Sequence, residues 1–374
     1  MPEAVFEALA AGLPSAEAGR FLVEAERGIS LLLLKTVAEA AGDGPVRSAF
    51  EMLVRLPAVE RVLRYPTVGA WARNAARGEK GDGMAALAMA AAFHSGQGLE
   101  LVVPAMDGVV TLPSAGRAVG STGRPSDPGG TWLPVRTICA SAGGATLRLT
   151  IDDLDPYRWP GVAASRLSTE EVTRWQSRLR QAWRLLCRHH GPLASELTTV
   201  VSVLVPLPGC GRLSGTSRDT FGSVAASLPA TATGLALLLA HEVQHAKLTA
   251  LLDLVDLLQP DEVGRLYYAP WRPDPRPLGG MLHGAYAHLG VAAFWRRQRH
   301  VDGSDDAHAQ FMRWRDAAAE GVELVADSGA LTALGHRFVD GIRVTLRDFE
   351  RDQVPAAARR LAGQAATAHR TRYA

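Results

Sequence analysis

The sequence contains little cysteine, and the cysteines it has are scattered. Cys139, Cys187 and Cys210 are the three among 374 residues, and none of them forms a Cys-x-x-Cys pair. Small extracellular domains use an even, closely spaced set of cysteines as a disulfide framework, and structural zinc sites use paired ones. The sequence therefore argues against both.

An excess of one charge and long apolar runs are also absent. Lys plus Arg number 40 and Asp plus Glu number 38, so the formal net charge is +2, which argues against a nucleic-acid surface covering the molecule. The most apolar runs, 31–34 and 235–240, are far shorter than the roughly 20 residues of a membrane span. The first residues also lack the pattern of a secretory signal. We expect a cytoplasmic protein that binds neither nucleic acid nor membrane.

The first half of the chain divides into two regions by the spacing of its hydrophobic residues. Hydrophobic residues make up 47% of the chain and charged ones 21%, which is typical of a globular protein with a sizeable core. Residues 1–97 repeat apolar positions at helical spacing and are predicted to form a helical N-terminal region. Residues 98–165 are predicted to be β-rich, with short strands at 99–103, 108–112 and 145–150 and a mobile loop or lid, rich in Gly, Ser and Pro, at 114–130.

Residues 166–374 form the third predicted region, which carries the candidate chemistry. A Ser168-x-x-Glu171 signature indicates the start of a helix that extends to about residue 190. The further elements predicted are strands at 198–207 and 221–228, helices up to residue 258, at 278–298 and at 305–334, and a rigid proline-rich loop at 267–277.

The most informative motif is His241-Glu242-Val243-Gln244-His245, which follows the apolar run 233–240. Residues four apart share one face of a helix, so both imidazoles can bind one divalent cation with little distortion of the backbone. The motif therefore predicts a metal site on a largely buried helix.

Two histidines leave such a metal under-coordinated, so a third protein ligand must come from elsewhere. His283 is the best candidate, because it lies on the next predicted helix between small residues that let a metal or substrate approach the backbone. His288 is the alternative. It lies about 140° around the helix from His283, so only one of the two is expected to face the metal. Asp253 and Asp256 follow too far along the first helix.

Two chemistries can use this site. In a zinc metallopeptidase, Glu242 is the catalytic residue, the general base that activates the attacking water. The metzincin extension is absent, since Leu248 and Leu251 occupy its glycine and third-histidine positions. A glutamate ligand from a later helix, Glu320 or Glu323, stays open.

In an oxygenase the metal is ferrous iron, three protein ligands occupy one face, and the open positions take a 2-oxo acid and dioxygen. This chemistry needs a cation for the distal carboxylate of the 2-oxo acid. Arg272 and Arg276 lie just before His283, and a guanidinium can bind a carboxylate through two parallel hydrogen bonds. The plain alternative for both arginines is pairing with Asp274 or capping the following helix.

Four segments, 241–248, 252–255, 267–280 and 282–287, resemble the H-E-x-x-H modification domain found in gene clusters for ribosomally synthesised peptide natural products. The resemblance is specific over residues 195–300 and weak outside them. That domain occurs alone or fused behind radical SAM maturases. This chain has no Cys-x-x-x-Cys-x-x-Cys motif, so it would be a free-standing member.

The resemblance implies an iron(II)- and 2-oxoglutarate-dependent peptide β-hydroxylase, despite the protease-like motif. Carried over to this sequence, it implies that His241, His245 and His283 bind iron and that Arg272 or Arg276 binds 2-oxoglutarate. Glu242 would lie beside the metal without an assigned role. The implied partners are a precursor peptide, 2-oxoglutarate and dioxygen, together with a radical SAM maturase of the same cluster.

The loop before the strand at 221–228 contributes further candidates. Ser214, Thr216, Ser217 and Arg218 would meet the peptide backbone or the cosubstrate, or they would merely form a turn. An exposed edge of that strand would bind an extended precursor by strand addition. We predict a mainly α-helical α+β fold in which a small antiparallel sheet packs on the helices that bear the HExxH site, and not a jelly roll.

Overall fold

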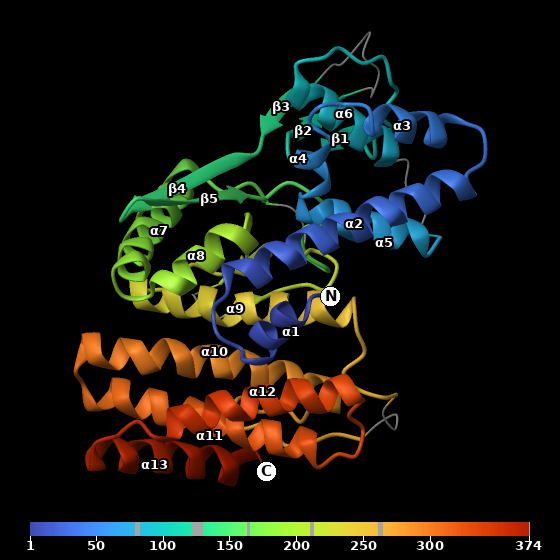
Figure 1. Cartoon of the computed structure of the whole chain (residues 1–374). Helices are drawn as coiled ribbons and strands as arrows, with labels where there is room; N and C mark the ends of the chain where they lie inside the picture. Colours follow the sequence, from blue (N-terminus) through green and yellow to red (C-terminus); the bar gives the residue numbers. More distant parts are fainter. Residues whose placement is uncertain (79–82, 122–129, 163–164, 210–212, 261–264, 374) are drawn as a thin grey trace.

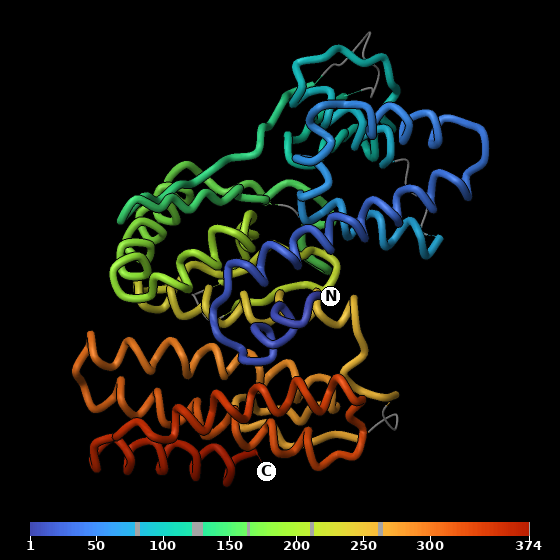
Figure 2. Tube along the Cα trace, viewed as in Figure 1, coloured from blue at the N-terminus to red at the C-terminus, as the bar shows by residue number. Residues whose placement is uncertain are grey.

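The computed structural model describes residues 1–373 except for five short segments, 79–82, 122–129, 163–164, 210–212 and 261–264. Helices dominate the fold and two small sheets accompany them (Figure 1), so the chain is a mainly helical α+β protein. The Cα trace shows the helices near the C-terminus stacked at one end and the helices between residues 45 and 95 at the other (Figure 2). Within the described residues, no helix is long and apolar enough to cross a membrane.

The N-terminal region is helical, as predicted. Ser15 begins the longest of these helices by accepting a hydrogen bond from the backbone N–H of Ala18, which satisfies one of the free donors of the first turn. The helices are α1 (Glu3–Ala10), α2 (Ala16–Ala40), α3 (Pro45–Leu53), α4 (Val59–Leu63), α5 (Pro66–Ala76) and α6 (Gly83–Ser95).

Within the described part of the chain, eight strands form two separate sheets. The first is antiparallel, in the order β1 (Val109–Leu112), β2 (Gly116–Val119), β3 (Thr131–Pro134). The second has the order β4 (Arg136–Ala142), β5 (Ala145–Ile151), β6 (Val203–Pro206), β8 (Ser223–Ala226), β7 (Ser214–Gly215). In this second sheet β6 runs parallel to both β5 and β8.

The sheet beside the HExxH helix is therefore mixed, and the prediction of an antiparallel sheet there is wrong. Two helices, α7 (Thr169–His189) and α8 (Gly191–Val200), connect β5 to β6. A helical crossover returns the chain in its original direction, which gives parallel pairing. The strand at 221–228 is also not an edge, because β8 is paired on both sides and all four of its residues are buried. On this side of β8 the sheet ends at the short β7, and β4 is the other edge strand.

Three local predictions need correction. Residues 99–103 are not a strand: Leu99, Leu101 and Val103 face the core, but no described segment pairs with them. The loop predicted at 114–130 contains β2, and its residues 122–129 lie outside the described part of the chain. The strand predicted at 198–207 begins late, because α8 extends to Val200.

The second half of the chain is a stack of helices, α9 (Ala232–Leu252), α10 (Leu278–Asp302), α11 (Asp305–Ala326), α12 (Ala333–Glu350) and α13 (Ala356–Tyr373). The capping box of Ser168 and Glu171 at the start of α7 is confirmed. The HExxH helix ends at Leu252, six residues earlier than predicted, and residues 257–259 instead pair with a segment near residue 330. The helix predicted at 305–334 ends at Ala326, and Gly329 takes the left-handed conformation that directs the chain into α12.

Helix α9 lies between two hydrophobic cores. Its Leu248 and Leu251 pack with α1 and α10–α13, whereas Leu239 and Val243 pack with the mixed sheet, α7 and α8. Burial on opposite faces explains why the helix is apolar nearly all round. The turn after α1 holds α9 in place, because Gln244 Nε2 donates to the carbonyl oxygen of Gly12 over 2.6 Å.

Candidate metal centre

The two motif histidines lie side by side on α9. Thr231 begins this helix by accepting a hydrogen bond from the N–H of Gly234, and His241 and His245 are partly buried near its middle. Their Nε2 atoms are 3.2 Å apart. Two nitrogens that bind one ion at about 2.0–2.1 Å with an angle of about 100° would have this separation. The same distance also allows a hydrogen bond between the rings, with the donor set by the tautomer.

Helix α10 brings both further histidines to this pair. The ring centroid of His283 is 5.9 Å from that of His245, and the ring centroid of His288 is 5.1 Å from that of His241. His241, the earlier histidine of α9, thus lies against His288, the later histidine of α10, as expected for neighbouring antiparallel helices. Each of the two therefore lies against a different motif histidine, and the expectation that only one of them faces a metal stays a prediction.

His288 is the most firmly held of the four rings. It stacks on Trp271, with centroids 5.0 Å apart and planes 17° apart, and its other neighbour is Trp314 at 4.9 Å. Its Nδ1 is 2.8 Å from the carbonyl oxygen of Gly284. A carbonyl can only accept, so Nδ1 carries the proton and Nε2 keeps its lone pair. Metal-binding histidines are commonly oriented by such a bond.

Gly284 has a different role from the one predicted. A Cβ added there would lie 2.2 Å from the Trp271 ring, so the missing side chain makes room for this tryptophan and not for a metal or substrate. Gly279, in the same helix, has nothing within 4 Å of an added Cβ. The sequence did not predict a role for Trp271 or Trp314. Their positions, one in the proline-rich loop and the other on a later helix, were the only indication the sequence offered.

The four imidazoles are uncharged at neutral pH. Burial lowers the pKa of His241 and His288 to about 3 and the pKa of His283 to about 4, and it holds the pKa of His245 well below its ordinary value. The positive charge of Arg218 adds to the lowering of the His283 pKa. An uncharged imidazole has the lone pair that a metal requires.

Among the described residues, the four histidines do not form a site with three converging metal ligands. Within the ranges that the structure describes, no group of three or more His, Cys, Asp and Glu side chains is arranged to hold a metal ion. The motif pair has the spacing of two ligands of one ion, and the α10 histidines lie at ring-contact distance from it. The donor set is thus imidazole only, which suits zinc, iron, copper or nickel better than calcium or magnesium.

Glu242 follows His241 on α9, and its side chain contacts β7. Its Oε1 accepts a hydrogen bond from Ser214 Oγ over 2.7 Å, and its buried Oε2 has no partner among the described residues. Burial raises the pKa of Glu242 to about 7, and the Ser214 hydroxyl opposes this rise. Trp159 packs against Gly215 and so supports the strand that carries Ser214. The loop before β8 therefore contacts the motif glutamate through Ser214.

Arg272 and Arg276, which were predicted to bind the carboxylate of 2-oxoglutarate, both form ion pairs with Asp274. Arg272 Nε lies 2.8 Å from Asp274 Oδ1 and Arg276 Nη1 lies 3.5 Å from Asp274 Oδ2, and both arginine side chains are 38% exposed. Backbone hydrogen bonds in both directions between Tyr267 and Arg276 close the loop that carries them. This ion pairing is the plain role considered for them, and their exposure leaves the guanidinium groups within reach of an incoming carboxylate.

The other carboxylates considered as ligands are engaged elsewhere. Asp253 accepts from Arg73 over 2.7 Å and from Arg218 over 2.6 Å at the end of α9. Glu320 pairs with Arg370, and Glu323 pairs with Arg343. These bonds place all three carboxylates in ion pairs with arginines.

Comparison with known proteins adds no assignment. No protein-family model matches the chain, and no curated protein matches its sequence.

Proposed function

We propose that the chain is an iron(II)- and 2-oxoglutarate-dependent dioxygenase that hydroxylates a Cβ in a ribosomally synthesised precursor peptide. The observation that carries the proposal is the pair of Nε2 atoms of His241 and His245, 3.2 Å apart, with an α10 imidazole against each ring. The resemblance of residues 195–300 to peptide-modification domains supports oxidation over hydrolysis.

Three imidazoles, those of His241, His245 and His283, would hold the iron. Three protein ligands on one face leave positions open for the cosubstrate and dioxygen. Bound iron(II) would supply the oxidising chemistry that breaks an unactivated C–H bond while 2-oxoglutarate is converted to succinate and carbon dioxide. The ring of His288 would either orient its neighbour His241 or replace His283 as the third ligand.

The remaining groups would bind the organic molecules. Arg272 or Arg276 would exchange its bond to Asp274 for the distal carboxylate of 2-oxoglutarate. The precursor would lie extended along the free edge of β7, since strand addition uses backbone hydrogen bonds that do not depend on peptide sequence. The enzyme would act in the cytoplasm, on a peptide handled also by a radical SAM maturase of the same cluster.

A zinc metallopeptidase is the second candidate, and Glu242 is the observation that favours it. One oxygen of its carboxylate is fixed by Ser214, and the other is buried without a partner among the described residues. A carboxylate held in this way beside two metal-binding histidines can accept the proton of a water that attacks a peptide carbonyl.

One reconstitution distinguishes the two. The apoprotein is loaded anaerobically with iron(II) or with zinc and then given 2-oxoglutarate, dioxygen and the short peptide encoded beside its gene. Mass spectrometry of the peptide is combined with an assay for succinate. Gain of one oxygen with release of succinate, in the iron sample alone, supports the hydroxylase. Cleavage of the peptide by the zinc sample without 2-oxoglutarate would overturn it.

Variants assign the ligands in the same assay. His283→Ala is expected to lose metal binding and activity, and His336→Ala, an exposed histidine of α12, is the matched control. If His283→Ala keeps full activity and His288→Ala loses it, His288 is the third ligand.

A further inference from the structure

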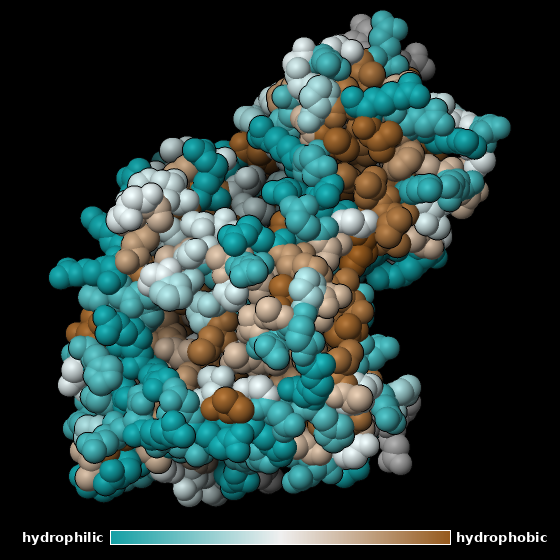
Figure 3. Space-filling model, viewed as in Figure 1, coloured by the Kyte–Doolittle hydropathy of each residue, from teal (hydrophilic) through white to brown (hydrophobic). Residues whose placement is uncertain are grey.

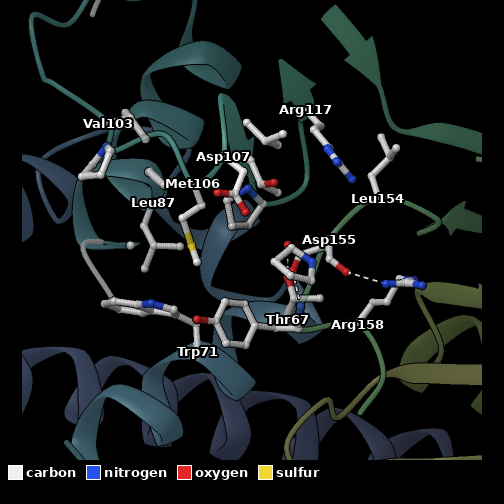
Figure 4. Close-up of a pocket in the computed structure, with 18 of the residues that line it drawn as sticks. Thr67, Trp71, Leu87, Val103, Met106, Asp107, Arg117, Leu154, Asp155 and Arg158 are labelled. Atoms are coloured by element: carbon white, nitrogen blue, oxygen red, sulfur yellow. Dashed lines mark hydrogen bonds between the residues drawn. The ribbon is translucent and has the colours of Figure 1, made fainter. Parts of the chain in front are cut away.

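A cavity of about 420 Å³ lies in the lobe that contains α5, α6 and the three-stranded sheet. Residues between 67 and 162 line it, and all of them precede the four histidines in the sequence. Its volume falls within the range of small-molecule sites. Figure 4 shows side chains from α5, α6, β2 and the segment after β5 converging on it. The space-filling view also shows hydrophobic residues gathered on the surface of this lobe (Figure 3). None of the four clustered histidines lines this cavity.

The body of the cavity is apolar. Trp71, Leu87, Val103 and Leu154 contribute walls that are almost fully buried. Met106 lies at the rim and is 75% exposed, which leaves the cavity open to solvent on that side. An apolar cavity that is open to solvent favours a ligand with an apolar body, because binding removes the surfaces of both from water.

One end of the cavity is polar and carries a guanidinium that has no counter-ion among the described residues. Arg117 extends from β2 toward Asp155 and Arg158 (Figure 4). Its Nε is buried and has no hydrogen-bond partner, and within the described ranges Arg117 forms no ion pair. A buried cationic donor left unpaired is costly, and an anion from outside the chain would remove that cost.

The buried carboxylates of the segment after β5 are bound to other groups. Asp155 accepts from Thr67 Oγ1 over 2.8 Å and from its own turn at Tyr157 N over 2.9 Å. Asp152 accepts from Tyr65, and Asp153 is shared by Arg136 and Arg166. Burial followed by the charge of Asp152 raises the pKa of Asp155 to about 7, which weakens the negative charge that this residue brings to the cavity lining.

We propose that this cavity binds a small apolar monocarboxylate, with its chain between Trp71 and Leu87 and its carboxylate on Arg117. Charge complementarity selects the anion, and the apolar walls select the body. This ligand site is separate from the proposed dioxygenase chemistry, since its lining includes no candidate metal ligand.

The test uses the metal-free protein of residues 1–374 and isothermal titration calorimetry with decanoate, decanol and decyltrimethylammonium as probes. Decanoate is expected to bind with one site per chain and at least about tenfold more tightly than decanol, because a hydrogen bond to a charged group contributes that much. The cationic probe should bind no better than decanol. Equal affinity for decanoate and decanol would overturn the proposal without any variant.

Variants locate the site. Arg117→Met should reduce decanoate affinity about tenfold and leave decanol unchanged, whereas Leu87→Trp should fill the cavity and abolish binding of both. The control is Arg148→Met, an exposed arginine of β5. Circular dichroism checks that each variant is folded. Unchanged decanoate binding by folded Arg117→Met, or by folded Leu87→Trp, would contradict the assignment. Because no metal is present, failure here is distinct from failure of the hydroxylase proposal.

Discussion

Replacing Gly284 with alanine tests whether Trp271 holds the candidate metal centre together. The new Cβ would lie 2.2, 2.3 and 2.5 Å from three atoms of the Trp271 ring, so the ring must move away from α10. Overpacking of this kind costs about 1–3 kcal/mol, and the better helix propensity of alanine returns at most about 1 kcal/mol. We expect a net loss of about 1–2 kcal/mol in the free energy of unfolding.

The same displacement should weaken metal binding. Trp271 stacks on His288, so a shifted ring releases an imidazole that packs against His241. Loss of such supporting contacts typically costs 10- to 100-fold in metal affinity. Urea unfolding followed by circular dichroism measures the stability, and anaerobic titration with iron(II) measures the affinity.

Gly279→Ala is the matched control, because an added Cβ there meets nothing within 4 Å. It should be neutral or stabilise the protein by up to about 1 kcal/mol. Adding Trp271→Leu to Gly284→Ala should remove most of the clash, so the two changes should not be additive. Wild-type stability and metal affinity in Gly284→Ala would refute this account of the tryptophan.

Three further predictions follow from other parts of the structure. Lys247 and Glu196 form an ion pair over 2.9 Å, and both side chains are 1% exposed. Lys247→Met leaves the buried Glu196 carboxylate without its counter-ion, so it should lower the free energy of unfolding in urea by about 3–5 kcal/mol. Adding Glu196→Leu should recover most of the loss. The pKa of Asp155 is raised to about 7, so the folded state holds this proton more tightly than the unfolded state does, and stability should fall as the pH rises from 4 to 7. Asp155→Asn should flatten this pH dependence of the free energy of unfolding. A variant with the wild-type pH profile would contradict the prediction. Either Arg272→Met or Arg276→Met should raise the KM for 2-oxoglutarate at least about tenfold in the succinate assay, and wild-type values in both would remove them as anchors.

The helices could largely be predicted from the sequence, because their signals are local. The Ser168 and Glu171 capping box, the apolar repeat of the first region and the helix after Pro277 all appear as expected. Strand pairing depends on distant segments, and there the predictions were weaker. The apolar alternation at 99–103 indicates a strand, but no described segment pairs with it.

The candidate site shows the same division between local and distant information. The proximity of His241 and His245 follows from helical spacing alone. The position of His288 follows from the packing of α10 on α9 and from two tryptophans that no local pattern relates to it. The partners of Arg272 and Arg276 lie two residues away in Asp274, so that ion pair was accessible to sequence reasoning.

The central claim is that these histidines hold an iron that oxidises a peptide. The most direct test is turnover of the iron-loaded protein with its precursor and 2-oxoglutarate under isotopically labelled dioxygen, followed by mass spectrometry. The account predicts that the peptide gains one labelled oxygen on a Cβ, that succinate forms in equal amount, and that His245→Ala abolishes both. A peptide that is cleaved, or that gains oxygen only from water, would contradict it.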